Sequence, residues 1–226
     1  MASTMEISWL GQSCFKLRGR EATVVLDPSK DLPARFAASR AGKAGLTADL
    51  VLITHRHHDH DKADLVGSID EQASLQVFDG AGEYEVKGVL ITGIPSFHDS
   101  SQGSERGANI IYHLLIDGLN VVHLGDLGQK KLTEDQIQQI SQTDILLIPV
   151  GGVYTIDGKE AAEIVAQLEP KIVIPMHYKI NGLKFELEGV DKFLKEMGAE
   201  NTQIQPKLVI TKEKLPEESM VVVLSI

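Results

Sequence analysis

One short segment constrains this chain more than any other, the heptapeptide Thr54-His55-Arg56-His57-His58-Asp59-His60. It holds half of the 8 histidines in the sequence and directly follows the apolar run Leu50-Val51-Leu52-Ile53. An apolar run of this kind is typical of a buried strand, so we expect the heptapeptide at a strand end. The alternative is a polar loop that contains histidines by chance.

The spacing within the heptapeptide indicates metal binding. Side chains alternate along an extended chain, so His55 and His57 point the same way. Asp59 and His60 follow a bend and can reach a second point nearby. Neutral imidazole and carboxylate are the usual ligands of zinc and related divalent ions. The pattern His-x-His-x-Asp-His could therefore serve two metal ions, one on each side of the turn.

Length and charge narrow the class of protein. The chain has 226 residues, and we interpret residues 1–226 as one domain with a substantial core. Its formal net charge of -10 argues against general nucleic-acid binding, which normally needs a basic face. The sequence is compatible with a homo-oligomer.

The cellular location follows from what the sequence lacks. The single cysteine, Cys14, allows no disulfide within the chain, and we interpret it as a buried structural thiol rather than a nucleophile. The N-terminus shows no signal peptide, and no apolar run approaches the roughly 20 residues that span a bilayer. We therefore expect a cytoplasmic protein without a membrane span.

Apolar periodicity predicts strand hairpins followed by strands that alternate with helices, which favours one mixed α/β domain. The expected strands are 7–17 with a bend at Gly11, 22–26, 75–78, 84–86, 89–94, 110–116, 119–124, 144–150, 171–176, 209–210 and 220–224. The expected helices are 62–69, 133–141 opened by a capping box, one that begins at Asp157, and 190–197. Segment 29–49 is expected as a solvated connection or a substrate-facing lid, with a short helix, and 100–107 as a flexible loop.

Three further residues extend the heptapeptide pattern. His98, Asp126 and His177 each follow a predicted strand, after the apolar runs 89–91, 121–122 and 172–174. Ligands converge at the open strand ends of α/β sheets, so these side chains are expected close to the heptapeptide. Four strand ends that all carry metal-ligand residues are far more specific than any one of them.

With these residues, the sequence resembles the metallo-β-lactamase superfamily, in which histidine and aspartate ligands follow one another in the same order. Several short segments of the sequence are most similar to the broad branch of this superfamily that includes the L-ascorbate-6-phosphate lactonase and N-acylphosphatidylethanolamine phospholipase D. These segments are Trp9-Leu10-Gly11, Asp27-Pro28, His123-Leu124-Gly125-Asp126-Leu127-Gly128, Gly151-Gly152-Val153-Tyr154-Thr155 and Pro175-Met176-His177-Tyr178. One departure is Gln12, where many relatives have histidine, and it bears on substrate details only.

The resemblance implies a four-layer αββα sandwich, of α+β or α/β class, with a dinuclear metal site at the strand ends. It implies that His55, His57 and His98 bind the first ion, that Asp59, His60 and His177 bind the second, and that Asp126 bridges both. Zn²⁺ is the first expectation, and Mn²⁺, Fe²⁺ and Ni²⁺ suit the same ligands.

This site implies a metal-dependent hydrolase. A metal-bridging hydroxide would attack an ester, lactone or phosphoester bond of a small molecule, with Asp59 and Asp126 as the catalytic carboxylates. A phosphodiesterase or nuclease of the same fold and a non-catalytic metal-binding module are the alternatives. A di-iron oxidoreductase is disfavoured, because such relatives typically place a carboxylate where His57 stands and carry a flavin domain.

Some residues near the strand ends are candidates for contact with substrate. Tyr154, Thr155 and Tyr178 are as compatible with ordinary packing as with substrate binding, and Arg106 could meet an anionic substrate or be a solvated loop residue. The remaining histidines, His58, His113 and His123, are interpreted as surface, core or supporting residues rather than ligands.

Overall fold

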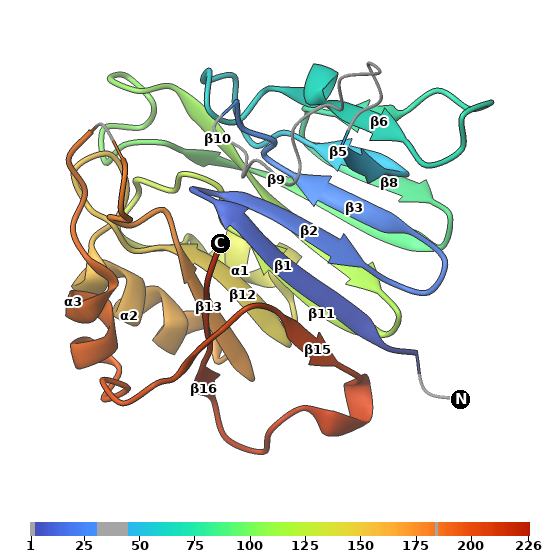
Figure 1. The fold of residues 1–226 in the computed structure, drawn as a ribbon. Coiled ribbons are helices and arrows are strands. Elements are labelled where there is room, and N and C mark those ends of the chain that lie inside the picture. The colour runs from blue at the N-terminus through green and yellow to red at the C-terminus, as the bar shows by residue number, and fades with distance from the viewer. Residues whose placement is uncertain (1–2, 31–44, 184) are drawn as a thin grey trace.

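Two β-sheets that face each other form the centre of the molecule (Figure 1). The computed structural model describes residues 3–30, 45–183 and 185–226. Within them, one sheet has six strands in the order β15-β1-β2-β3-β5-β7, and the other has seven in the order β16-β13-β12-β11-β10-β9-β8. Both sheets are mixed, because antiparallel hairpins continue into parallel strands.

The elements have the following bounds. The six-stranded sheet contains β1 (Met5–Gly11), β2 (Cys14–Arg18), β3 (Thr23–Leu26), β5 (Leu50–Leu52), β7 (Gln76–Phe78) and β15 (Leu208–Ile210). The seven-stranded sheet contains β8 (Gly82–Val86), β9 (Val89–Phe97), β10 (Ala108–Ile116), β11 (Leu119–His123), β12 (Ile145–Pro149), β13 (Ile172–Met176) and β16 (Met220–Val221). Two short ladders pair β4 (Leu46–Ala48) with β6 (Val66–Ser68), and β14 (Ile204–Gln205) with β17 (Val223–Leu224). The α-helices are α1 (Glu134–Ile140), α2 (Gly158–Leu168) and α3 (Val190–Glu196).

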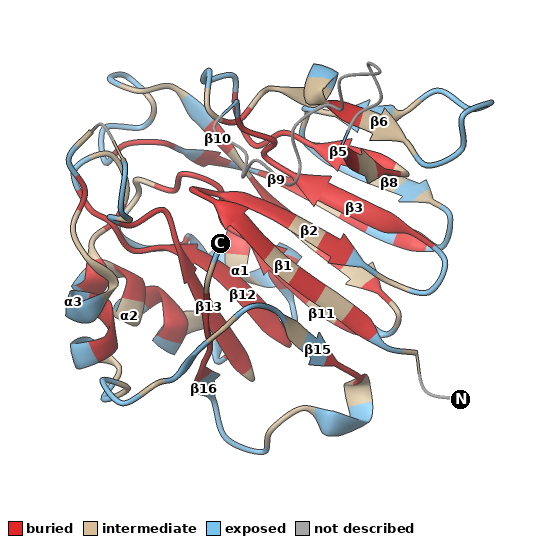
Figure 2. Cartoon of the chain, viewed as in Figure 1, coloured by how far each residue is buried: buried red, intermediate tan, exposed pale blue. Residues whose placement is uncertain are grey.

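The main core lies between the two sheets, where the buried faces of the strands meet (Figure 2). Trp9, Phe15 and Tyr112 are its largest fully buried side chains. A smaller apolar cluster, which includes Leu46, Val51 and Val66, lies where the β4–β6 ladder packs on strands of the six-stranded sheet. Burial of apolar side chains on both faces explains why the central strands read as continuous apolar runs.

The helices lie beside the seven-stranded sheet (Figure 1). Thr133 caps the N-terminus of α1 and Asp157 caps that of α2, and each of these two residues forms a full capping box with the residue three positions on. The capping box at Thr133 confirms the sequence prediction. Together the two sheets and their helices confirm the expected metallo-β-lactamase fold. No helix of the described residues is both long and apolar enough to cross a membrane.

Strand direction explains how the predicted site comes together. Strands β11, β12 and β13 are parallel, so their C-terminal ends share one edge of the sheet. Strand β9 is antiparallel to β10, which is antiparallel to β11, so β9 ends at that edge too. The heptapeptide of the other sheet is tied to this edge because Ile110 N donates to Thr54 O at 2.9 Å.

The structure corrects two predictions. Segment 7–17 is a hairpin of β1 and β2 rather than one bent strand, because Gln12 has a left-handed backbone (φ 49°) and its carbonyl accepts a hydrogen bond from Trp9 Nε1 at 2.7 Å. The predicted helix at 62–69 is wrong. It is a short 3-10 turn, Ala63–Leu65, followed by β6, because Val66–Ser68 finds a strand partner in β4.

Two segments were predicted as loops, 29–49 and 100–107. The structure describes the first only in part, and the second differs from the prediction. In segment 29–49, residues 31–44 lie outside the described residues, and Leu46–Ala48 forms a strand. Segment 100–107 was predicted to be flexible, but its backbone is organised around the carboxylate of Asp99. That carboxylate accepts four backbone N–H bonds of 2.8–3.0 Å from Ser101, Gly103, Glu105 and Arg106.

Candidate metal centre

The carboxylate of Asp126 is the point on which the predicted ligands converge. Its Oδ2 lies 3.2 Å from His177 Nε2, 3.3 Å from His60 Nε2, 3.5 Å from His98 Nε2 and 4.0 Å from His55 Nε2. These five side chains come from four strand ends and are all at least nine-tenths buried. The structure therefore brings together residues that are up to 122 positions apart, from His55 to His177.

The predicted ligands form two groups around this carboxylate. His55, His57 and His98 offer ligand atoms within 4.8 Å of one another, and so do Asp59, His60 and His177. The rings of His55 and His57 meet edge to face with centroids 4.6 Å apart. The two groups are the two sets that the sequence predicted for separate ions. Each offers three donor atoms of the type that zinc prefers.

Asp27 and Thr54 orient two of the histidines. Asp27 Oδ2 accepts from Thr54 Oγ1 at 2.7 Å and lies 3.1 Å from His60 Nδ1. Because the Thr54 hydroxyl donates its hydrogen bond to Asp27, its oxygen accepts a hydrogen bond from His55 Nδ1 at 2.9 Å. In this network Nδ1 of both histidines carries a proton, so Nε2 is the ring nitrogen of each that faces Asp126. Asp27, His55 and His60 also cluster within ligand distance, but these hydrogen bonds occupy the facing atoms, so the cluster supports the other groups.

Asp126 is itself held by neighbouring residues. Ser13 Oγ donates to its Oδ1 at 2.8 Å, and its backbone N–H donates to Asn109 Oδ1 at 3.0 Å. The preceding Gly125 has φ 58°, and a Cβ there would contact the side-chain oxygen of Asn109 and lie 2.8 Å from Thr54 Cβ. Only glycine allows this close approach, so the turn that aims Asp126 needs it.

Burial and neighbouring charge set the protonation of the cluster. Burial lowers the pKa of His55 to about 3 and lowers the pKa of His98 and His177. Burial alone would also lower the pKa of His60, but the carboxylates of Asp126 and Asp27 raise it well above its usual value. Burial opposes ionisation of Asp126, yet the surrounding imidazoles hold its pKa well below the usual range. Most of the histidines are therefore neutral near pH 7, as ligands must be.

Unpaired ring nitrogens supply an independent test of whether a metal fits. His55 Nε2 and His60 Nε2 are buried without a hydrogen-bond partner among the described residues, and so is Nδ1 of His98 and of His177, whose Nε2 atoms are the ones that face Asp126. Buried polar atoms are normally paired, because an unpaired one costs roughly 1–3 kcal/mol. The two unpaired Nε2 atoms that face Asp126, those of His55 and His60, suit a bound cation, so the residues fit the divalent ions that the sequence implies.

The cluster opens into a pocket of about 400 Å³. Its lining residues are His57, His58, Asp59, His98, Arg106, Asp126, Tyr154, His177 and Phe185. Arg106 stacks over the Tyr154 ring with its guanidinium carbon 4.9 Å from the ring centroid, and it donates to Val153 O at 3.4 Å. The loop organised around Asp99 thus places a cation at the wall of the metal pocket.

The other candidates from the sequence take varied positions. Arg106 and Tyr154 line the pocket, but Thr155 donates to the Ile156 carbonyl and Tyr178 is only 6% exposed, against Trp9 at a centroid distance of 4.9 Å. Burial raises the pKa of Tyr178 to about 12. Neither Thr155 nor Tyr178 is among the described residues that line the metal pocket.

The remaining histidines are supporting or peripheral, as predicted. His123 accepts from Gly125 N at 3.0 Å and lies 2.8 Å from the Ser13 carbonyl, so it braces the turn before Asp126. His113 pairs with Asn120 on neighbouring strands, and the ring of His58 is largely exposed at the pocket wall.

Sequence reasoning missed the role of Asp27, Thr54, Ser13 and Asn109. Asp27 offered one signal, because it also follows a buried strand, β3, as the predicted ligands do. Ser13 and Asn109 offered none, since their contacts with Asp126 join positions 113 and 17 residues apart.

Comparison with known proteins agrees with this geometry. A family model described as a beta-lactamase superfamily domain matches residues 6–177. A UPF0173 metal-dependent hydrolase from Thermococcus onnurineus is 32% identical over 198 residues, which are 77% of this chain and 84% of that protein.

Solved structures show the same fold. A proposed Zn-dependent hydrolase of the metallo-beta-lactamase superfamily from Thermotoga maritima is 37% identical, with a TM-score of 0.75 over 97% of this chain and 98% of its own. Igni18, a metallo hydrolase from Ignicoccus hospitalis, is 23% identical, with a TM-score of 0.62 over 92% of this chain and 98% of its own, and shows the fold alone.

Proposed function

Because the chain belongs to the beta-lactamase superfamily domain family, and within it to the UPF0173 metal-dependent hydrolases, we propose that it is a dinuclear hydrolase. It acts on an ester, lactone or phosphoester bond of a small molecule. The observation that carries this proposal is the convergence of four histidine Nε2 atoms on Asp126 Oδ2 at 3.2–4.0 Å. A pocket of about 400 Å³ is in the size range of small-molecule sites.

The proposed ligand sets follow the two groups of side chains. His55, His57 and His98 would hold one ion, and Asp59, His60 and His177 would hold the other, with the Asp126 carboxylate shared by the two groups of side chains. Two divalent ions, zinc in the first place, would supply Lewis acidity and lower the pKa of a bound water from 15.7 toward about 7. The carboxylate of Asp126, ionised through its imidazole neighbours, is the group best placed to offset the charge of both.

The chain's own residues would perform the remaining tasks. Asp59 lies at the pocket wall, where its carboxylate can orient the attacking group and hold a proton. Arg106 can bind an anionic group of the substrate, because its guanidinium is fixed by the Tyr154 ring and the Val153 carbonyl. Tyr154 would form the wall against which the substrate rests.

Membership of the branch that includes the L-ascorbate-6-phosphate lactonase and N-acylphosphatidylethanolamine phospholipase D is a finer proposal. This finer proposal rests on the short sequence segments that resemble that branch. A substrate panel for this protein should therefore include phosphorylated lactones and phosphodiesters beside simple esters.

The decisive experiment pairs metal analysis with turnover. Protein purified without added metal is expected to hold at least one tightly bound transition metal, and about two after zinc reconstitution. The rates at which the wild type hydrolyses generic esters, lactones and bis-p-nitrophenyl phosphate are then compared with the rates of the His57→Ala and Asp126→Ala variants. His113→Ala is the matched control, since His113 pairs with Asn120 outside the cluster.

The expected result is that both site variants lose activity by at least about a hundredfold, while the control does not. Turnover that survives both site substitutions contradicts the hydrolase mechanism. Metal bound at the predicted stoichiometry, with no turnover on any member of the panel, would favour a non-catalytic metal-binding module.

A further inference from the structure

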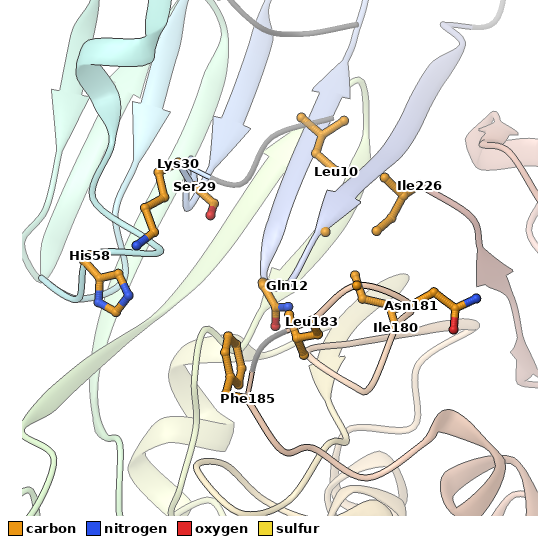
Figure 3. A pocket seen from close by; sticks show the side chains of 12 residues that line it. Leu10, Gln12, Ser29, Lys30, His58, Ile180, Asn181, Leu183, Phe185 and Ile226 are labelled. Atoms are coloured by element: carbon orange, nitrogen blue, oxygen red, sulfur yellow. The ribbon is translucent and has the colours of Figure 1, made fainter. Parts of the chain in front are cut away.

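A second cavity adjoins the metal pocket. It has a volume of about 460 Å³. Its lining residues are Leu10, Gly11, Gln12, Ser29, Lys30, His58, Ile180, Asn181, Gly182, Leu183, Phe185 and Ile226. His58 and Phe185 line both spaces, so the second cavity lies next to the metal pocket. We call it the side cavity. Figure 3 shows His58 and Lys30 on one side of it, Ile180 and Ile226 on the other, and Gln12 between them.

The wall of the side cavity combines large apolar side chains with polar ones, among them Gln12, Lys30 and Asn181. Five large apolar side chains contribute to it, those of Leu10, Ile180, Leu183, Phe185 and Ile226. They come from β1 and from two segments far along the chain, so the cavity exists only in the folded molecule. A partly apolar recess of this size beside a polar reaction site favours a ligand with an apolar part.

One polar group in this wall lacks a partner. Gln12 is 4% exposed, and its Oε1 is buried without a hydrogen-bond partner among the described residues. The Gln12 main chain is committed elsewhere, since its carbonyl accepts from Trp9 Nε1 at 2.7 Å and from His177 N at 3.2 Å. Gln12 lines the cavity, so a rotation of its side chain would turn this buried oxygen toward a ligand from which it can accept a hydrogen bond.

We propose that the side cavity binds an apolar part of the substrate that carries a hydrogen-bond donor, an N–H or O–H group, which Gln12 Oε1 accepts. The substrate class is then a medium-sized acyl or alkyl compound whose cleavable bond lies over the metal cluster. This inference rests on the proposed function. The two spaces share His58 and Phe185, so a substrate whose apolar part occupies the side cavity would reach past these residues to the metal cluster.

A matched pair of uncleavable probes tests the assignment without turnover. N-methylhexanamide has one N–H donor, and N,N-dimethylhexanamide has none but a similar shape. Calorimetric titration of the zinc-loaded protein should show about tenfold tighter binding of the first, because an accepted hydrogen bond satisfies the buried oxygen. In Gln12→Met, which keeps the side-chain length and removes the acceptor, the difference should vanish.

A second variant covers the case in which Gln12→Met does not fold. Leu183→Trp fills the side cavity and should weaken N-methylhexanamide binding at least about tenfold. Ile69→Trp, on a residue that is 48% exposed and lines neither space, is the matched control and should bind as the wild type does.

The outcomes separate the two proposals. Equal binding of the two amides to the wild type, or binding unaffected by Leu183→Trp, overturns the side-cavity assignment whatever the enzyme hydrolyses. Selective amide binding that depends on Gln12 supports the assignment even if every substrate on the hydrolysis panel fails, in which case only the proposed function falls.

Discussion

Asp27 Oδ2 lies 3.1 Å from His60 Nδ1, although the two residues are 33 positions apart in the chain. The carboxylate is fully buried and also accepts the N–H and the hydroxyl of Thr54, at 2.8 and 2.7 Å. This carboxylate therefore controls which ring nitrogen of His60 faces the metal centre. Outer partners of this kind typically change metal affinity by about 10–100-fold when removed.

Asp27→Asn should accordingly reduce zinc affinity by about 10–100-fold, because the amide cannot hold the His60 proton in place as a carboxylate does. Competition with a chromophoric chelator measures the affinity. Asp49→Asn is the matched control, since Asp49 accepts from Thr23 N at 2.7 Å and lies outside the metal groups. Equal affinity in wild type and Asp27→Asn would contradict the orienting role.

Zinc affinity should rise with pH, because a proton on His60 competes with the metal. The carboxylates of Asp126 and Asp27 outweigh burial and hold the pKa of His60 well above its usual 6.5, so the metal-free protein keeps this proton at neutral pH. Without metal, the protonated His60 stabilises the fold fully below pH 6.5, and this contribution is lost as pH rises through the raised pKa. Calorimetry in buffers of different ionisation enthalpy should detect proton release on zinc binding, and its absence would contradict the assignment.

Arg106→Ala should raise KM for anionic substrates by about tenfold to a hundredfold while neutral substrates change little. Arg106→Lys should recover only part of the loss, because lysine keeps the charge but lacks the planar fork that stacks on Tyr154. Arg20→Ala is the control, at an arginine that is 69% exposed and pairs with Glu21. Equal effects on anionic and neutral substrates would indicate a general structural role instead.

Asp99 should contribute to stability in acid. Burial would raise the pKa of its carboxyl, but the N–H groups of Arg106, Gly103, Glu105 and Ser101 lower it to about 2 from 3.8. Its contribution is therefore complete above about pH 4 and is lost as pH falls toward 2. Chemical denaturation of wild type and Asp99→Asn should show the variant less stable at neutral pH and the two curves converging in acid. A constant difference across this range would rule out the ionised carboxylate as the cause.

Local sequence patterns were sufficient for most strands and for placing the candidate ligands at the strand ends. Apolar runs followed by histidine or aspartate placed His98, Asp126 and His177 at strand ends, because burial and strand alternation act over a few neighbouring residues. The capping box at Thr133 was readable for the same reason, since its partner is three residues away. Segment 62–69 was misread as a helix because its strand partner, β4, lies about 20 residues earlier.

The sequence by itself thus indicated the fold family, through its resemblance to the metallo-β-lactamase superfamily, and the candidate donor residues, through the residue types at each strand end. Tertiary structure alone decided how those donors are held and what lies beside them. The packing of two sheets sets Asp27 against His60 and Ser13 against Asp126, and it joins Leu10, Ile180 and Ile226 around the side cavity. Contacts over such separations depend on how the sheets face each other, and no local periodicity encodes that arrangement.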